Sequence, residues 1–103
     1  MKDGKWQSRQ RVEQMESIFN SQIQLVSALQ TILEQVETSQ PAYLELLDYY
    51  QSSTFLEDMD LADRGEFKHL PCGVLSEDGV YNLLVDRKEL TKMMKKCIHL
   101  LEN

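Results

Sequence analysis

The chain has 103 residues, room for one core, and we predict a single domain over residues 1–103. Hydrophobic residues make up 42%, near the globular average, which argues against disorder. Eleven Lys and Arg stand against seventeen Asp and Glu, and the net charge of −6 disfavours nucleic acid and anionic membranes as partners. Only four Gly and two Pro interrupt the chain, so we expect long helices.

The first predicted element is a long helix over residues 8–37, which contain no Gly or Pro. Its apolar residues recur every three or four positions, and a second row repeats every seven residues beside them. We call the combined surface the apolar stripe, and it is wider than a two-row coiled-coil seam. Its members are Val12, Met15, Ile18, Phe19, Leu25, Val26, Leu29, Ile32, Leu33 and Val36. Residues 1–7 before it are polar and are predicted as a flexible N-terminus.

Pro41 predicts the end of this helix, because proline disfavours helical geometry in the residue before it. Proline is at home in the first turn of a helix, so we expect a short second helix up to Tyr50. A short link makes two helices antiparallel neighbours, which predicts a helical hairpin.

Residues 55–75 lose the periodicity and are predicted as an irregular acidic connector, with Gly65, Pro71 and Gly73 as turn markers. One helical turn formed by Phe55, Leu56, Met59 and Leu61 stays open. A C-terminal helix follows, with Ser76 as its N-cap. A break of this helix near Val85 stays open. The fold class is therefore all-α, resembling a three-helix bundle.

Several short motifs follow one another along the chain in a characteristic order. A basic residue and an M-E step lie in the first helix, and Q-P-x-Y, paired tyrosines, an E-D step and G-V-L-S-E-D-G-V-Y-x-L-L follow. These are Arg11, Met15, Glu16, Gln40, Pro41, Tyr43, Tyr49, Tyr50, Glu57, Asp58 and residues 73–84. The chain thereby resembles a family of small bacterial proteins of unknown function. The resemblance implies a bacterial origin and a helical domain, and it implies no activity.

No compartment signal stands out in the sequence. The N-terminal residues lack the apolar core of a signal peptide, no apolar run is long enough for a membrane span, and two cysteines are too few for a disulfide scaffold. We therefore expect a cytoplasmic protein.

The sharpest metal candidate combines His69 and Cys72 with Cys97 and His99, because zinc prefers such ligands in fours. Residues two apart on a helix point about 200° apart, so the last two cannot face one ion. We predict no metal site, no cofactor and no catalytic residue. An EF-hand starting at Asp58 also fails, because its sixth and twelfth positions lack Gly and Glu.

Two charged surfaces are candidates for binding. Residues 45–66 hold seven acidic residues and one basic residue, which accounts for the whole net charge. In the C-terminal helix a basic face is formed by Lys88, Lys92, Lys95 and Lys96, with Arg87 beside it. We interpret the basic face as solvated, because acidic residues dilute it and no aromatic is interleaved for base stacking.

The short second helix cannot cover the apolar stripe alone, and either the C-terminal helix or a second copy could complete the cover. We therefore predict a non-enzymatic protein–protein interaction or regulatory module, with a protein partner or a second copy bound. The alternative is a cation-binding or enzymatic domain built on residues 57–63 and the turn at 76–78. The candidate binding residues are Tyr49, Tyr50, Glu57, Asp58, Asp60, Asp63, Ser76, Glu77, Asp78 and Tyr81.

Overall fold

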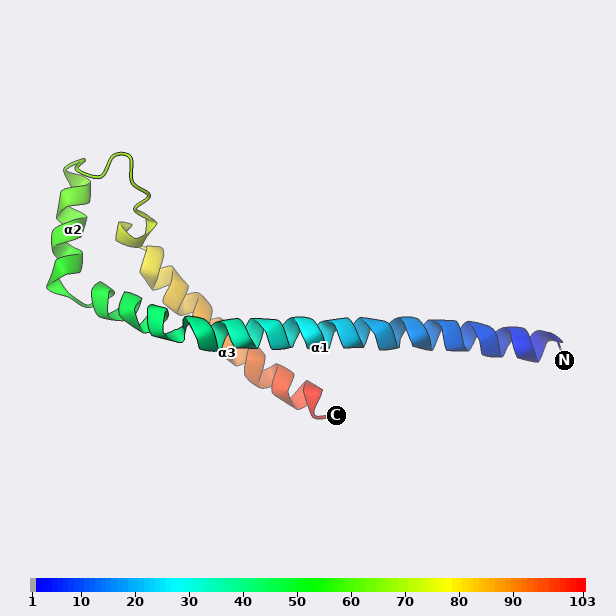
Figure 1. Cartoon of the computed structure of the whole chain (residues 1–103). Helices are drawn as coiled ribbons and strands as arrows, with labels where there is room; N and C mark the ends of the chain where they lie inside the picture. Colours follow the sequence, from blue (N-terminus) through cyan, green and yellow to red (C-terminus); the bar gives the residue numbers. More distant parts are fainter. Residues whose placement is uncertain (1) are drawn as a thin grey trace. The chain divides into compact units, whose positions relative to one another are not determined.

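The computed structural model describes residues 2–103, with side chains from Gly4 onward. Three α-helices and one short 3₁₀ helix occur over these residues, and no strand (Figure 1). Helix α1 spans Lys2–Tyr50, α2 spans Ser53–Asp63, η1 is the 3₁₀ turn Gly73–Leu75, and α3 spans Gly79–Leu101. The predicted all-α class with three helices is confirmed, but two of the three helices are not the predicted ones.

Helix α1 passes through Pro41 without a turn, so the predicted hairpin with a short antiparallel second helix is wrong. Proline removes one backbone donor and leaves the Glu37 carbonyl oxygen without its usual partner four residues on. The flanking residues are good helix formers, and here the helix tolerates this loss. Its end at Tyr50 agrees with the predicted end of the second helix.

The start of α1 also differs from the prediction. The helix begins at Lys2 rather than near residue 8, so residues 2–7, predicted as a flexible N-terminus, are helical. Met1 lies outside the described residues.

The predicted acidic connector is helical over its first half, because α2 covers residues 53–63. The Ser52 hydroxyl caps α2 by accepting a hydrogen bond from the Phe55 amide at 3.3 Å. Gly65 ends α2 with φ +80°, while the Glu66 amide bonds the Leu61 carbonyl and the Gly65 amide bonds the Ala62 carbonyl. This is a Schellman motif, which favours glycine at the left-handed position. Residues 64–72 are irregular, as predicted.

Helix α3 runs unbroken past Val85, which settles the open question of a second cap there. It begins at Gly79, so Asp78 rather than Ser76 is the N-cap residue, and the Asp78 side chain makes no capping bond.

The chain divides into two compact units, Met1–Leu44 and Glu45–Asn103. The described part of the first unit is a single helix. In the second unit α2 and α3 both contact η1. The buried hydrophobic side chains of the described residues are Phe55 and Val80, with 6% and 4% of their surface exposed, and no described polar side chain is buried. The prediction of one domain stays a prediction.

Candidate functional site

Four of the predicted binding residues lie where α1 ends and α2 begins, and three of them form one cluster around Phe55. The ring of Phe55 contacts Tyr49 and Tyr50 edge-on, with centroids 5.5 and 5.1 Å apart. The Tyr49 hydroxyl donates a hydrogen bond to Asp58 Oδ2 at 2.5 Å. Edge-to-face aromatic pairs are attractive beyond the area that they bury. The cluster therefore fixes the corner between the two helices. The side chains of Tyr49 and Asp58 stabilise this corner by bonding each other.

The backbone supports the same corner. The Ser52 hydroxyl donates to the Tyr49 carbonyl at 2.6 Å while it accepts from the Phe55 amide. One side chain thus bonds the last turn of α1 to the first turn of α2, which brings Phe55 against the tyrosines.

The hydrogen bond to Asp58 raises the pKa of Tyr49 from 10.0 to about 12, with desolvation as the next cause. Because the folded pKa lies above the unfolded one, the neutral phenol stabilises the fold below pH 10, and this contribution is lost between pH 10 and about 12. We expect Tyr49→Phe to remove one tyrosinate transition near pH 12 from the ultraviolet absorbance titration. Asp58→Asn should move that transition toward 10. Loss of a transition near pH 10 in the Tyr49→Phe variant would contradict the assignment.

The remaining acidic candidates do not join Asp58. Successive α-helical residues are rotated by about 100°, so Asp60 lies between Glu57 and Asp63 around α2, and all three lie on a different side from Asp58. Asp60 pairs with Arg64 at 2.8 Å on the exposed surface. Among residues 2–103 no group of three or more His, Cys, Asp or Glu side chains comes together to hold a metal ion. The geometry therefore gives the cation-binding alternative no support.

The four histidine and cysteine residues likewise form no group of three or more within the described chain. His69 and Cys72 lie in the irregular segment, where the Cys72 thiol donates to the Leu70 carbonyl at 3.1 Å. Cys97 and His99 lie on α3, and both are exposed. Both cysteines are free.

The turn before α3 contains three further candidates, the first turn of α3 contains Tyr81, and Ser76 organises the turn. Its hydroxyl donates to the Gly73 carbonyl at 2.7 Å and accepts from the Gly79 amide at 3.1 Å. Ser76 therefore joins η1 to the first turn of α3, which is a capping role two positions ahead of the N-cap residue. Glu77, Asp78 and Tyr81 are exposed beside it.

Gly79 is required by the close approach of this turn. A Cβ at Gly79 would overlap the Gly73 carbonyl oxygen and lie 2.5 Å from Ser76 Oγ, whereas a Cβ at Gly73 would meet nothing within 4 Å. We expect Gly79→Ala to lower the free energy of unfolding by about 1–3 kcal/mol, measured by urea denaturation, as overpacking does. Gly73→Ala is the matched control and should change it by less than about 0.5 kcal/mol. Equal effects of the two substitutions would contradict the described turn.

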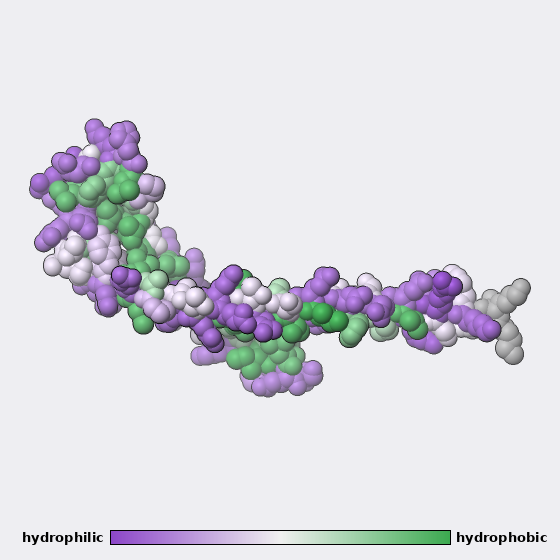
Figure 2. Space-filling model, viewed as in Figure 1, coloured by the Kyte–Doolittle hydropathy of each residue, from purple (hydrophilic) through white to green (hydrophobic). Residues whose placement is uncertain are grey.

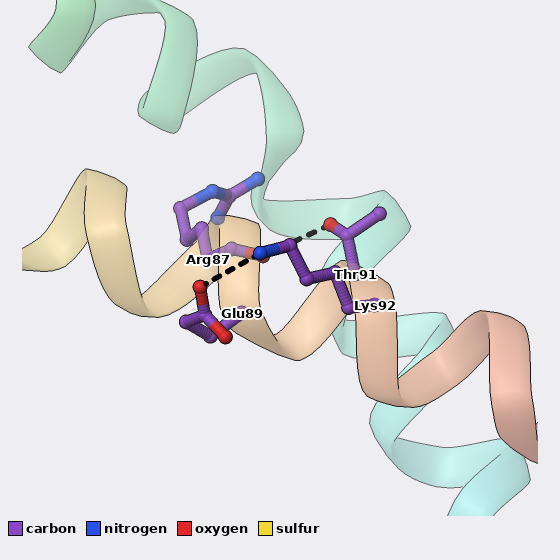
Figure 3. Close-up of polar contacts among 4 residues, drawn as sticks. All are labelled: Arg87, Glu89, Thr91 and Lys92. Atoms are coloured by element: carbon purple, nitrogen blue, oxygen red, sulfur yellow. Dashed lines mark hydrogen bonds and ion pairs between the residues drawn. The ribbon is translucent and has the colours of Figure 1, made fainter.

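The four lysines of the basic face of α3 are exposed, and Figure 3 shows part of this helix. Lys92 Nζ reaches Glu89 Oε1 at 3.1 Å, and both side chains are more than 60% exposed. The Thr91 hydroxyl donates to the Arg87 carbonyl at 2.9 Å within the helix. Exposed ion pairs of this kind contribute little to stability.

The apolar stripe of α1 is exposed in the described chain. Figure 2 shows apolar side chains on the surface of α1 among hydrophilic ones. Val12, Phe19 and Val26 keep 64, 58 and 57% of their surface exposed. A shallow depression on the stripe is lined by Phe19, Ile23 and Val26 together with polar neighbours. The candidate binding residues predicted from sequence omit this surface, although the three- and four-residue spacing marks it.

No described helix combines the length and the hydrophobicity that crossing a bilayer demands.

Comparison with known proteins assigns the chain to a family. Residues 12–97 match the model of a domain of unknown function, DUF4298, so the chain belongs to that family and the resemblance inferred from its motifs is confirmed. No curated protein matches the chain. No solved structure matches it either.

Proposed function

We propose that this member of the DUF4298 family is a non-enzymatic helical module that binds another polypeptide chain through the apolar stripe of α1. One observation carries the proposal: the stripe is exposed, and the described part of the unit that contains it is a single helix with no second element to cover it. The occupant is a helix with a complementary apolar face.

The energetics of a lone helix support this function. Isolated helices are marginal in water, and most helical stability comes from packing an amphipathic face. Full burial of one large aliphatic or aromatic side chain contributes about 1.5–3 kcal/mol. The stripe has ten such positions, so its burial is the largest source of stability that the first unit has available. Exposed apolar patches of this extent mark interaction sites.

The roles of the polar candidates support a non-enzymatic function. Tyr49 and Asp58 bond each other at the corner, and Ser76 bonds both sides of its turn. Free Cys72 and Cys97 fit a reducing compartment, which supports the cytoplasm as the place of action. The bundle-like packing predicted from sequence then forms between chains.

The experiment places a photo-reactive phenylalanine analogue at Val26, in the stripe, and at Gln24, which helical rotation places on the opposite side of α1. The full chain is irradiated inside the cells from which it comes. We expect Val26 to cross-link to a polypeptide chain outside its own molecule and Gln24 to give little cross-linking.

Two results would overturn the proposal. Equal cross-linking from both positions would show that the stripe is not the binding surface. Cross-links from Val26 only to α3 of the same chain would show that the stripe is covered from within.

A further inference from the structure

We infer that the occupant of the stripe is α1 of a second copy of this chain, running antiparallel. This inference rests on the proposed function and names its partner. Two independent features of α1 support it: the unequal flanks of the stripe and the charge at the two ends of the helix.

The residues of the stripe occupy two sets of positions on α1, a central seam and one flank beside it. A three-four alternation forms the seam, and its members are Met15, Ile18, Gln22, Leu25, Leu29, Ile32 and Val36. The apolar flank consists of Val12, Phe19, Val26 and Leu33. Each of them follows one of Ser8, Met15, Gln22 and Leu29 by four positions. The opposite flank is mostly polar and consists of Gln14, Ser21, Ala28 and Gln35.

These unequal flanks select the direction of the partner helix. In a parallel pair of identical helices, each flank faces the opposite flank of the partner. The exposed Phe19 and Val26 would then lie against Gln and Ser side chains. In an antiparallel pair each flank faces its own copy, so the two apolar flanks bury each other. The antiparallel pair therefore buries the seam and the apolar flank together.

Charge along α1 favours the same direction. Lys5, Arg9 and Arg11 lie near the N-terminal end, Glu34 and Glu37 lie toward the other end, and residues 17–33 between them carry no charge. An antiparallel pair brings each basic end to an acidic end, whereas a parallel pair brings like charges together.

The acidic residues in the N-terminal half do not cancel this effect. Glu13 and Glu16 lie on the outer side of α1, as Glu34 and Glu37 do. With both of them counted, residues 2–16 still carry a net charge of +1, whereas residues 34–45 carry −3. Arg9 has an exposed contact of 3.5 Å with Glu13, which is too weak to hold it from a carboxylate of the second copy.

The seam also specifies a register. Pairing Met15 with Ile32 of the second copy, and Ile18 with Leu29, sets the two-fold axis between residues 23 and 24. The seam positions from Met15 to Ile32 then lie opposite one another. Their layers are apolar in both copies except where Gln22 meets Leu25, and Val36 lies opposite Arg11.

This register makes two further placements. Ser8 lies opposite Ser39 of the second copy, since both continue the three-four alternation of the seam. Along the helix axis, Glu37 of the second copy lies level with the midpoint between Arg9 and Arg11. The first placement supplies a pair of positions for a cross-linking test.

The test uses disulfide cross-linking in a chain whose own cysteines are replaced by Cys72→Ser and Cys97→Ser. Ser8→Cys and Ser39→Cys are introduced in separate full-length chains, each alone and then mixed, and the samples are oxidised. The two positions are about 46 Å apart along one helix, so they cannot bond within a chain. Both serines are exposed, so neither substitution removes packing.

We expect the mixture to give a several-fold excess of disulfide-linked dimer over either variant alone. The matched control mixes Asn20→Cys with Ser27→Cys, which lie at matching heights in the same register but on the outer side of α1, and it should give little dimer.

Two outcomes overturn the inference. Dimers from Ser8→Cys or Ser39→Cys alone, at the level of the mixture, would show a parallel pair. No dimer in any sample would show that the occupant is not a second copy, and cross-links from Val26 to a different protein would then leave the proposed function standing.

Discussion

Replacing Phe55 by alanine is expected to destabilise α2 by about 3–5 kcal/mol, the usual cost of truncating a buried phenylalanine. Phe55 is 6% exposed and contacts both Tyr49 and Tyr50, so the substitution removes the centre of the corner. The amide protons of α2 should exchange with solvent at least about a hundredfold faster, up to the rate of an unfolded segment.

The matched control is the next residue, Leu56, which is 66% exposed. Leu56→Ala removes an apolar side chain from the same helix without opening the corner, and it should change stability by less than about 0.5 kcal/mol. Similar exchange rates in the two variants would contradict the packing described for Phe55.

Replacing Pro41 by alanine is expected to stabilise α1 by about 3 kcal/mol, because alanine restores the missing backbone donor and removes the crowding of the ring. Slower amide exchange in the turns around residue 41, together with a higher urea midpoint by circular dichroism, would report the gain. Gln40→Ala is the control, since it leaves the backbone donors unchanged and should shift stability by only about a few tenths of a kcal/mol.

If the chain turned at Pro41, the change in stability on substitution by alanine would have the opposite sign. Proline in a first helical turn is preorganised by its fixed φ, so its replacement would be neutral or destabilising. Pro41→Ala therefore separates the continuous helix from the hairpin predicted from sequence.

The prediction at Pro41 failed because the local signal is ambiguous. Proline is compatible with the first turn of a new helix and is tolerated inside an established one, and both cases show the same sequence. The long-range continuity of α1 decides between them. Helix α2 was not predicted for a different reason: its start depends on the cap made by Ser52 and its end on the left-handed Gly65, and the spacing of apolar residues shows neither role.

Other features of the fold could be predicted from local chemistry. The end of α1 at Tyr50, the turn at Gly65 and the bonds of Ser76 all depend on residues next to one another in the chain. The pairing of Tyr49 with Asp58 could not be predicted in this way, because it depends on the angle at which the chain turns through residues 51 and 52.

The apolar stripe was predicted from its spacing, and its exposure was not. A periodic pattern shows which side of a helix needs cover, but it does not show whether that cover comes from the same chain. The charge-free middle of α1 and its unequal flanks add the information that points to a second copy.

Sedimentation equilibrium of the full chain at high micromolar concentration tests the antiparallel pairing of α1 most directly. We expect twice the mass of one chain, and a return to the single-chain mass for Leu25→Glu, in the seam. Gln24→Glu, which adds the same charge on the opposite side of α1, should remain a dimer. A single-chain mass for the unaltered protein, or equal masses for the two variants, would contradict the pairing.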